Sequence, residues 1–206
     1  MKSRRVKDIE AYRNPLAAEW RQETVEYVKM AATPMAMQPT AYIRNSRANM
    51  LHGQVSELQV ASVHDGETLA LALSWEGVAP PGRDFPDAVA VTFPVRGNPI
   101  LMLMGSKNDS IHILQWKAGK GVRSLLANGI GLSDKGPELK IASRAEEDGK
   151  RWRVVITRVL GQGANVAPVV PGHETKIGFA VWSGINDERA GLKSFSLDWI
   201  PFAVDA

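Results

Sequence analysis

Short segments of alternating apolar and polar residues, separated by turn signals, run through most of this chain and constrain its fold more than any other feature. Residues 69–75 place Leu, Leu, Leu and Trp at every second position. This spacing is typical of a strand, because successive side chains of a strand point to opposite faces of the sheet. Regular strands without helical crossovers predict an all-β fold, specifically an antiparallel β-sandwich. Helical segments are expected to be short and to lie in loops, such as the one around residues 15–21.

Turn residues divide the predicted strands. One hairpin is expected to turn at residues 64–67 and another at Glu147-Asp148-Gly149. Ile100–Met104 is apolar on both faces, as is typical of a central strand or of one that borders a buried ligand. Two glycine-rich connections are too long for plain turns, and the first is predicted to fold over a cofactor or to dock on a partner. These connections cover residues 119–136 and 161–172. Further strands are expected over residues 89–95, 111–116, 176–182 and 193–199.

Composition excludes several classes of protein. The chain has 206 residues, which suits a single domain over residues 1–206. It has no cysteine, which excludes disulfides, thiolate metal sites and covalently attached c-type haem. The net charge of +3 is small, and the basic start at Lys2–Lys7 is predicted to be a solvated tail, so no nucleic-acid surface is expected. No apolar run is long enough for a membrane span. Residues 1–5 resemble the start of a signal peptide, but no apolar segment follows them.

Lys193 occupies an unusual position in the last predicted strand. Counting every second residue of this strand, Lys193 falls on the same face as Phe195, Leu197 and Trp199 and not on the face of the polar residues between them. Its amine is therefore expected to point toward the core. Burial disfavours a charged amine, which must then be paired, neutral or bound to a metal. The alternative is that Lys193 lies at the end of the sheet and extends its ammonium to water.

Other side chains with suitable chemistry give weaker signals. Met102 and Met104 share one strand face, and a thioether is a soft ligand, although paired methionines in strands are usually core residues. His112 is the histidine that competes most seriously for a ligand role. The carboxylates are explained by loops and ion pairs, and no nucleotide-binding or hydrolase motif occurs. The chain by itself is therefore not expected to be an enzyme.

A set of residue blocks occurs in a characteristic order between about residue 55 and residue 200. The set resembles the haem b (gamma) subunit family of ethylbenzene dehydrogenase, which includes the gamma subunits of dimethylsulfide dehydrogenase, selenate reductase and chlorate reductase. The blocks are Trp75-Glu76-Gly77, Asp87 to Pro94, Met104-Gly105 followed by Ile113 to Ala118, and Ala180 to Gly184 with Glu188 to Ser194, closing at Trp199.

This resemblance implies a function and a site. In the family a methionine and a lysine hold one haem b, and the matching residues here are Met104 and Lys193, with Met102 or His112 as replacements for Met104. It implies one non-covalent haem b per chain, a fold like that of carbohydrate-binding modules, and electron transfer without catalysis. The implied partners are a molybdenum-cofactor catalytic subunit, an iron–sulfur subunit and an external redox carrier. The implied location is the periplasm, with the cytoplasm as the alternative.

Two other functions stay open for a small β-sandwich with six tryptophans. A carbohydrate-binding module would need tryptophans on a solvent-exposed face for stacking on sugars, whereas Trp75 and Trp199 fall on apolar faces. A purely structural subunit would need no cofactor. The absorption spectrum of the purified chain distinguishes these possibilities from a haem protein.

Overall fold

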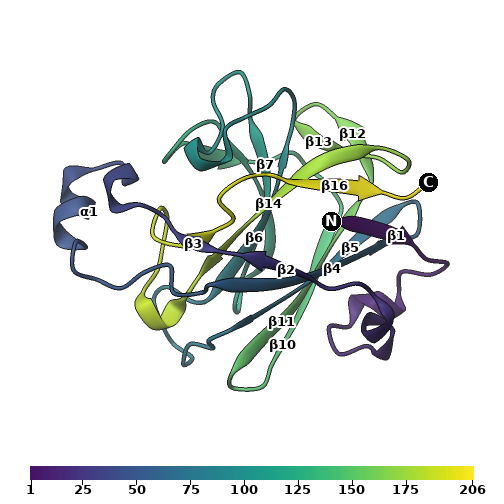
Figure 1. Cartoon of the computed structure of the whole chain (residues 1–206), viewed down its shortest axis with the longest axis horizontal. Helices are drawn as coiled ribbons and strands as arrows, with labels where there is room; N and C mark the ends of the chain where they lie inside the picture. Colours follow the sequence, from purple (N-terminus) through teal and green to yellow (C-terminus); the bar gives the residue numbers. More distant parts are fainter.

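The computed structural model describes residues 1–206, and its strands form two layers packed face to face (Figure 1). The first layer contains β2 (Glu26–Lys29), β4 (Glu57–His64), β5 (Thr68–Glu76), β11 (Arg151–Val159) and β10 (Ile141–Glu147). The second layer contains β14 (Glu174–Trp182), β6 (Ala88–Pro94), β7 (Ile111–Lys117), β8 (Gly121–Ala127) and β9 (Ser133–Lys135). The predicted β-sandwich is confirmed.

The two ends of the chain join these layers. β1 (Lys2–Arg5) lies between β4 and β16 (Ile200–Val204), and β16 pairs with β14. β1 runs parallel to both of its neighbours, so it departs from the otherwise antiparallel pattern. The termini consequently lie close together (Figure 1). The prediction of a solvated basic tail was wrong, because backbone pairing with two strands orders this segment.

The remaining elements are short and lie at the edge of a layer or outside both layers. β3 (Ala31–Ala32) and β15 (Ser194–Phe195) extend the second layer beside β14, while β12 (Gly161–Gly163) and β13 (Val166–Val169) form a separate hairpin. α1 (Ala41–Ser46) projects from one side of the molecule (Figure 1). Five 3-10 turns complete the chain: η1 (Ala11–Arg13), η2 (Ala18–Gln22), η3 (Met35–Met37), η4 (Leu101–Leu103) and η5 (Gly184–Asn186).

Alternating residues of both layers fill the space between them. Leu69, Leu71, Leu73 and Trp75 are all fully buried in this core, as their spacing predicts. Trp75 packs against Trp116 and Trp152, with ring centroids 6.2 and 6.4 Å away. Trp116 and Trp152 belong to strands that are distant from Trp75 in sequence. Apolar contacts between distant parts of the chain therefore stabilise the sandwich.

Apolar residues also cover the outward face of each layer. On the first layer, the N-terminal segment packs Ile9, Tyr12 and Trp20 against Val63 and Val155. On the second layer, η4 and the segment after β14 cover a group that includes Ala90, Ile113 and Ala180. Strand β6 is buried on both faces as a result. The second outward cluster contains the site described below.

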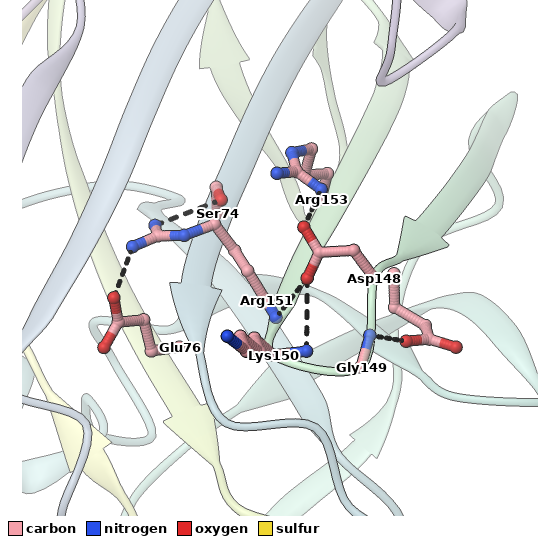
Figure 2. A network of polar contacts seen from close by, with 8 residues as sticks. Ser74, Glu76, Asp148, Gly149, Lys150, Arg151 and Arg153 are labelled. Carbon is pink, nitrogen blue, oxygen red and sulfur yellow. Dashed lines mark hydrogen bonds and ion pairs between the residues drawn. The ribbon is translucent and has the colours of Figure 1, made fainter.

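The predicted hairpin joins β10 to β11, and hydrogen bonds within its turn hold it. Asp148 accepts hydrogen bonds from the backbone N–H groups of Lys150 (3.1 Å) and Arg151 (2.9 Å), and its carboxylate pairs with Arg153 at 2.9 Å (Figure 2). These contacts hold the pKa of Asp148 below its usual value, the backbone bond from Arg151 being the main cause. Gly149 takes the left-handed backbone conformation that such a turn needs.

Two long connections are more regular than their glycine content suggests. Residues 119–136 form most of the hairpin between β8 and β9, and residues 161–172 contain the β12–β13 hairpin. The prediction of irregular loops was therefore wrong. Their glycines supply left-handed backbone at the strand ends, as at Gly121, Gly129 and Gly131, and do not interrupt the pairing.

Replacing Trp75 by alanine should lower the free energy of unfolding by about 3–5 kcal/mol, because it leaves a cavity among the three tryptophans. Chemical denaturation followed by circular dichroism measures the change. Leu51→Ala is the control, since Leu51 is exposed and its loss should change the free energy by less than about 0.5 kcal/mol. Equal losses in the two variants would contradict this assignment of the core.

Candidate functional site

A pocket lies on the outward face of the second layer, beneath η4 and the segment that follows β14. Its floor is made of small side chains, namely Ala90 and Thr92 of β6 and Ala180 of β14. These residues alternate with the large core residues Val89, Val91 and Phe93, which point the other way. One face of β6 therefore fills the core while the other leaves room for a ligand.

The pocket is only partly open in this structure. Space for water-sized molecules amounts to about 60 Å³, and the whole depression, including its open mouth, contains about 610 Å³ free of protein atoms. Sites for drug-sized ligands and cofactors usually measure roughly 300–1,000 Å³. A macrocycle therefore needs the cover to move outward. The cover consists of 3-10 turns and loops, so this movement would not break the main strand ladder.

Met104 reaches the pocket from the end of η4. The predicted strand over residues 100–104 was wrong: Leu101–Leu103 form a 3-10 turn, and Met104 adopts a left-handed conformation at φ 59°. Such a conformation is unfavourable for a side chain with a Cβ atom and indicates constraint by the surroundings. The Met104 carbonyl accepts a hydrogen bond from Gly129 N at 3.0 Å. This bond ties Met104 to the turn between β8 and β9, whose Ile130 also lines the pocket.

Lys193 reaches the same pocket from the other side. Its Nζ lies 3.6 Å from the sulfur of Met104 and 5.3 Å from the ring of Trp182. The residue is 8% exposed and takes part in none of the ion pairs of the structure. Burial lowers the pKa of the amine from 10.5 to about 8. The expectation that this side chain points inward agrees with the structure, whereas extension to water does not.

The strand predicted around Lys193 is much shorter than expected. Pairing with β14 involves only Ser194 and Phe195, and the alternation fails beyond that point, since Leu197 is 60% exposed. Trp199 is half-buried and donates a hydrogen bond to the Pro99 carbonyl at 2.7 Å. Phe195 does line the pocket together with Lys193, as their parity predicts.

The two alternative ligands are placed differently. Met102 lines the pocket but is 37% exposed, and no contact of its sulfur with the amine is present. His112 points into the sandwich, on the face of β7 opposite Ile113, where Nε2 lies 3.0 Å from Ser124 Oγ and Nδ1 accepts from Ala167 N at 3.4 Å. Burial lowers the pKa of His112 to about 4, with a smaller effect of Arg158. His112 is thus a hydrogen-bonded core residue outside the pocket.

The donor set suits a metal that binds both a thioether and an amine. A neutral amine offers a lone pair, and a thioether is a soft ligand. The two donor atoms lie 3.6 Å apart, so Met104 and Lys193 would be the residues that hold such a metal. An apolar pocket with one buried amine that lacks a counter-charge therefore fits a haem in its chemistry, once the cover opens.

Sequence reasoning overlooked two buried carboxylates and the small residues of the pocket floor. Asp87 accepts hydrogen bonds from Ala79 N, Gly184 N and Trp152 Nε1, and Glu188 accepts from Gly53 N and Ser183 N. Both bind backbone groups near the pocket, so their role is structural. Small residues alternating with large ones in Ala88–Phe93 are the signal that could have revealed the floor.

Nothing in the structure favours sugar binding or an additional metal cluster. The six tryptophans are buried or half-buried, so none presents an exposed ring for stacking. No group of three or more His, Cys, Asp or Glu side chains could hold a metal ion. The structure also has no helix with the length and apolar character needed to cross a bilayer.

Solved structures show which architecture the chain shares. A family 9 carbohydrate-binding module from Caldicellulosiruptor kristjanssonii, in complex with glucose, superposes over 100% of this chain and 95% of its own with a TM-score of 0.59 and 10% identity. A carbohydrate-binding protein from Bacteroides uniformis gives a TM-score of 0.54, 9% identity and coverage of 100% and 98%. At these identities the similarity concerns the fold alone.

Sequence relatives show which proteins the chain resembles. No protein-family model matches the chain. The gamma subunit of chlorate reductase from Ideonella dechloratans is 37% identical over 56% of this chain, which spans about half (49%) of that relative. A respiratory nitrate reductase haem subunit from Haloferax mediterranei is 29% identical over 91% of this chain and 67% of its own length. The gamma subunit of dimethylsulfide dehydrogenase from Rhodovulum sulfidophilum is 26% identical over 70% of this chain and 59% of its own length. The chain is thus similar in sequence to the gamma subunits of a reductase and a dehydrogenase and to a haem subunit of a nitrate reductase, in agreement with the resemblance carried by the sequence blocks.

Proposed function

We propose that the chain binds one haem b non-covalently, with Met104 and Lys193 as axial ligands, and transfers electrons without catalysing a reaction of its own. The contact between Lys193 Nζ and Met104 Sδ at 3.6 Å supports this proposal most directly. The two residues are far apart in sequence, yet the fold brings their donor atoms together in an apolar pocket. A relative of similar sequence is named a haem subunit.

The surroundings suit electron transfer. A bound haem supplies one-electron redox chemistry. A methionine ligand raises the potential of haem iron, and an apolar environment with restricted solvent access also influences it. Ligation by two protein side chains leaves no position for a substrate at the iron. The chain's own residues would hold the cofactor, exclude water and keep the amine neutral.

The proposed partners are a molybdenum-cofactor catalytic subunit, an iron–sulfur subunit and an external redox carrier, in the periplasm. Two relatives are named gamma subunits, which implies that they function with other subunits. Exposed apolar side chains near the pocket, among them Ile100, Leu103 and Leu132, provide a surface that such a subunit could cover. Fractionation of the native host tests the location: a cytoplasmic signal would contradict this part of the proposal.

Lys193→Leu and Met104→Leu should each abolish the six-coordinate low-spin spectrum of the haem-loaded protein and weaken haem binding at least about tenfold, because each replaces a ligand side chain by one that cannot bind iron. Absorption spectroscopy and haem titration measure both effects. Lys193→Leu should also stabilise the haem-free protein by about 1–3 kcal/mol, since it removes a buried amine without a partner.

Met102→Leu is the matched control, because Met102 lines the same pocket. It should leave the spectrum and the haem affinity unchanged. If Met102→Leu removed the low-spin signal while Met104→Leu preserved it, Met102 would be the ligand in place of Met104. An unchanged spectrum in Lys193→Leu would rule out the lysine as a ligand.

Haem affinity should depend on pH through the amine of Lys193. The pKa of this amine is about 8 in the folded chain, and only the neutral form can bind iron. Below pH 8 haem must displace one proton, so the association constant should rise about tenfold per pH unit and level off above about pH 8. Titration between pH 6 and 9 measures this slope. A flat profile in the wild type would contradict the displacement of a proton, and Lys193→Leu should lack the slope.

The same ionisation affects stability with a definite sign. The folded pKa of about 8 lies below the value of 10.5 for the free side chain, so the unfolded chain binds more protons between these pH values. The stability of the haem-free protein should therefore rise with pH from 8 to 10.5, by up to about 3 kcal/mol. Denaturation of wild type and Lys193→Leu across this range isolates the contribution of Lys193.

A further inference from the structure

The loop that carries Lys193 into the pocket has an unusual backbone. It runs from Ser183 at the end of β14 to Lys193, just before β15. Two non-glycine residues in it, Asp187 and Ala190, have left-handed conformations, at φ 52° and 50°. Residues with a Cβ atom adopt this region at a cost, and they stay there only where surrounding contacts fix them.

Glu188 is the side chain that fixes this loop from within. It is 2% exposed, and its two carboxylate oxygens accept hydrogen bonds from Gly53 N at 2.7 Å and Ser183 N at 2.9 Å. It forms no ion pair with a lysine or arginine. Burial raises the pKa of Glu188. This buried carboxylate therefore holds two backbone N–H groups that belong to separate segments of the chain.

A second set of contacts connects the Gly53 segment to Lys193 itself. His52, next to Gly53, has its Nε2 2.8 Å from the carbonyl oxygen of Thr33. Thr33 in turn donates from its backbone N–H (3.0 Å) and its hydroxyl (3.2 Å) to the carbonyl oxygen of Lys193. Glu188 is thus linked to the backbone of Lys193 both along the loop and through residues 52–53 and Thr33.

We propose that Glu188 is a positioning residue for Lys193: by joining the end of β14 to the Gly53 segment, it holds the Lys193 backbone where the amine reaches the pocket. Glu188 itself does not line the pocket and would not touch the cofactor. This inference rests on the proposed function for its consequence in haem binding, but the placement of the amine is a property of the chain without haem.

Chemical labelling of the haem-free protein tests the placement directly. An amine-reactive acetylating reagent followed by peptide mass spectrometry gives the labelling rate of Lys193 relative to Lys107, which is exposed and serves as an internal reference. Glu188→Leu should raise this ratio at least about tenfold, because it removes both hydrogen bonds and the loss of a single buried hydrogen bond already corresponds to about that factor. Glu188→Gln should raise it less, because its amide oxygen can still accept one of the two N–H groups.

Glu23→Gln is the matched control for losing a buried carboxylate. Glu23 is also buried but lies in the N-terminal segment, where Arg4 and Tyr12 bind it. This variant should lower the melting temperature without changing the Lys193 labelling ratio. A ratio in Glu188→Leu equal to that of the wild type, or an equal rise in Glu23→Gln, would overturn the positioning role.

Haem loading then separates this inference from the proposed function. In Glu188→Leu the haem should show a mixture of high-spin and low-spin signals that added butylamine converts to low spin, while Glu188→Gln stays closer to the wild type. If labelling changes as expected but Lys193→Leu keeps the wild-type haem spectrum, the positioning role stands and lysine ligation fails. If labelling stays constant and Lys193→Leu loses the spectrum, ligation stands and the positioning role fails.

Discussion

A single buried amine without a counter-charge is the constraint on which the site depends. Keeping Lys193 in the pocket lowers its pKa from 10.5 to about 8, which corresponds to a cost of about 3 kcal/mol in the haem-free chain. No carboxylate offsets this cost: Asp87 and Glu188 are buried, but their oxygens accept hydrogen bonds from backbone N–H groups and, for Asp87, also from Trp152 Nε1. Because these carboxylates bind other groups, the amine of Lys193 has no counter-charge and is available to a different partner.

The hydrophobic core and the pocket lie on opposite faces of the second layer. Its core lies between the layers, where large residues such as Trp75, Phe93 and Phe179 pack together. The pocket lies outside the second layer and uses the opposite, small-residue face of the same strands. The same architecture occurs in a carbohydrate-binding module at 10% identity, so the sheets alone do not fix what the chain binds. The proposed function depends on the side chains that line the pocket, which come from both the strands and their cover.

Several features were predictable because they depend on local rules. The alternation of residues 69–75 and the turn at Asp148-Gly149 follow from side-chain period and turn chemistry, and both were confirmed. Ile100–Met104 was misassigned because an apolar run without alternation fits a buried strand and a buried turn equally well. The strand at Lys2–Arg5 was missed because it pairs with distant residues at both edges, and pairing of that kind leaves no local pattern in a basic segment.

The sequence by itself determined the β-sandwich, the strand face that Lys193 shares with Phe195 and, through ordered residue blocks, the resemblance to gamma subunits. Only the tertiary structure decided that Lys193 and Met104 meet, because 89 residues separate them and no local rule relates η4 to the loop after β14. It also decided that the meeting point lies outside the second layer. The physical reason is that these placements depend on which distant strands pair and on which face each segment covers, and both are properties of the whole fold.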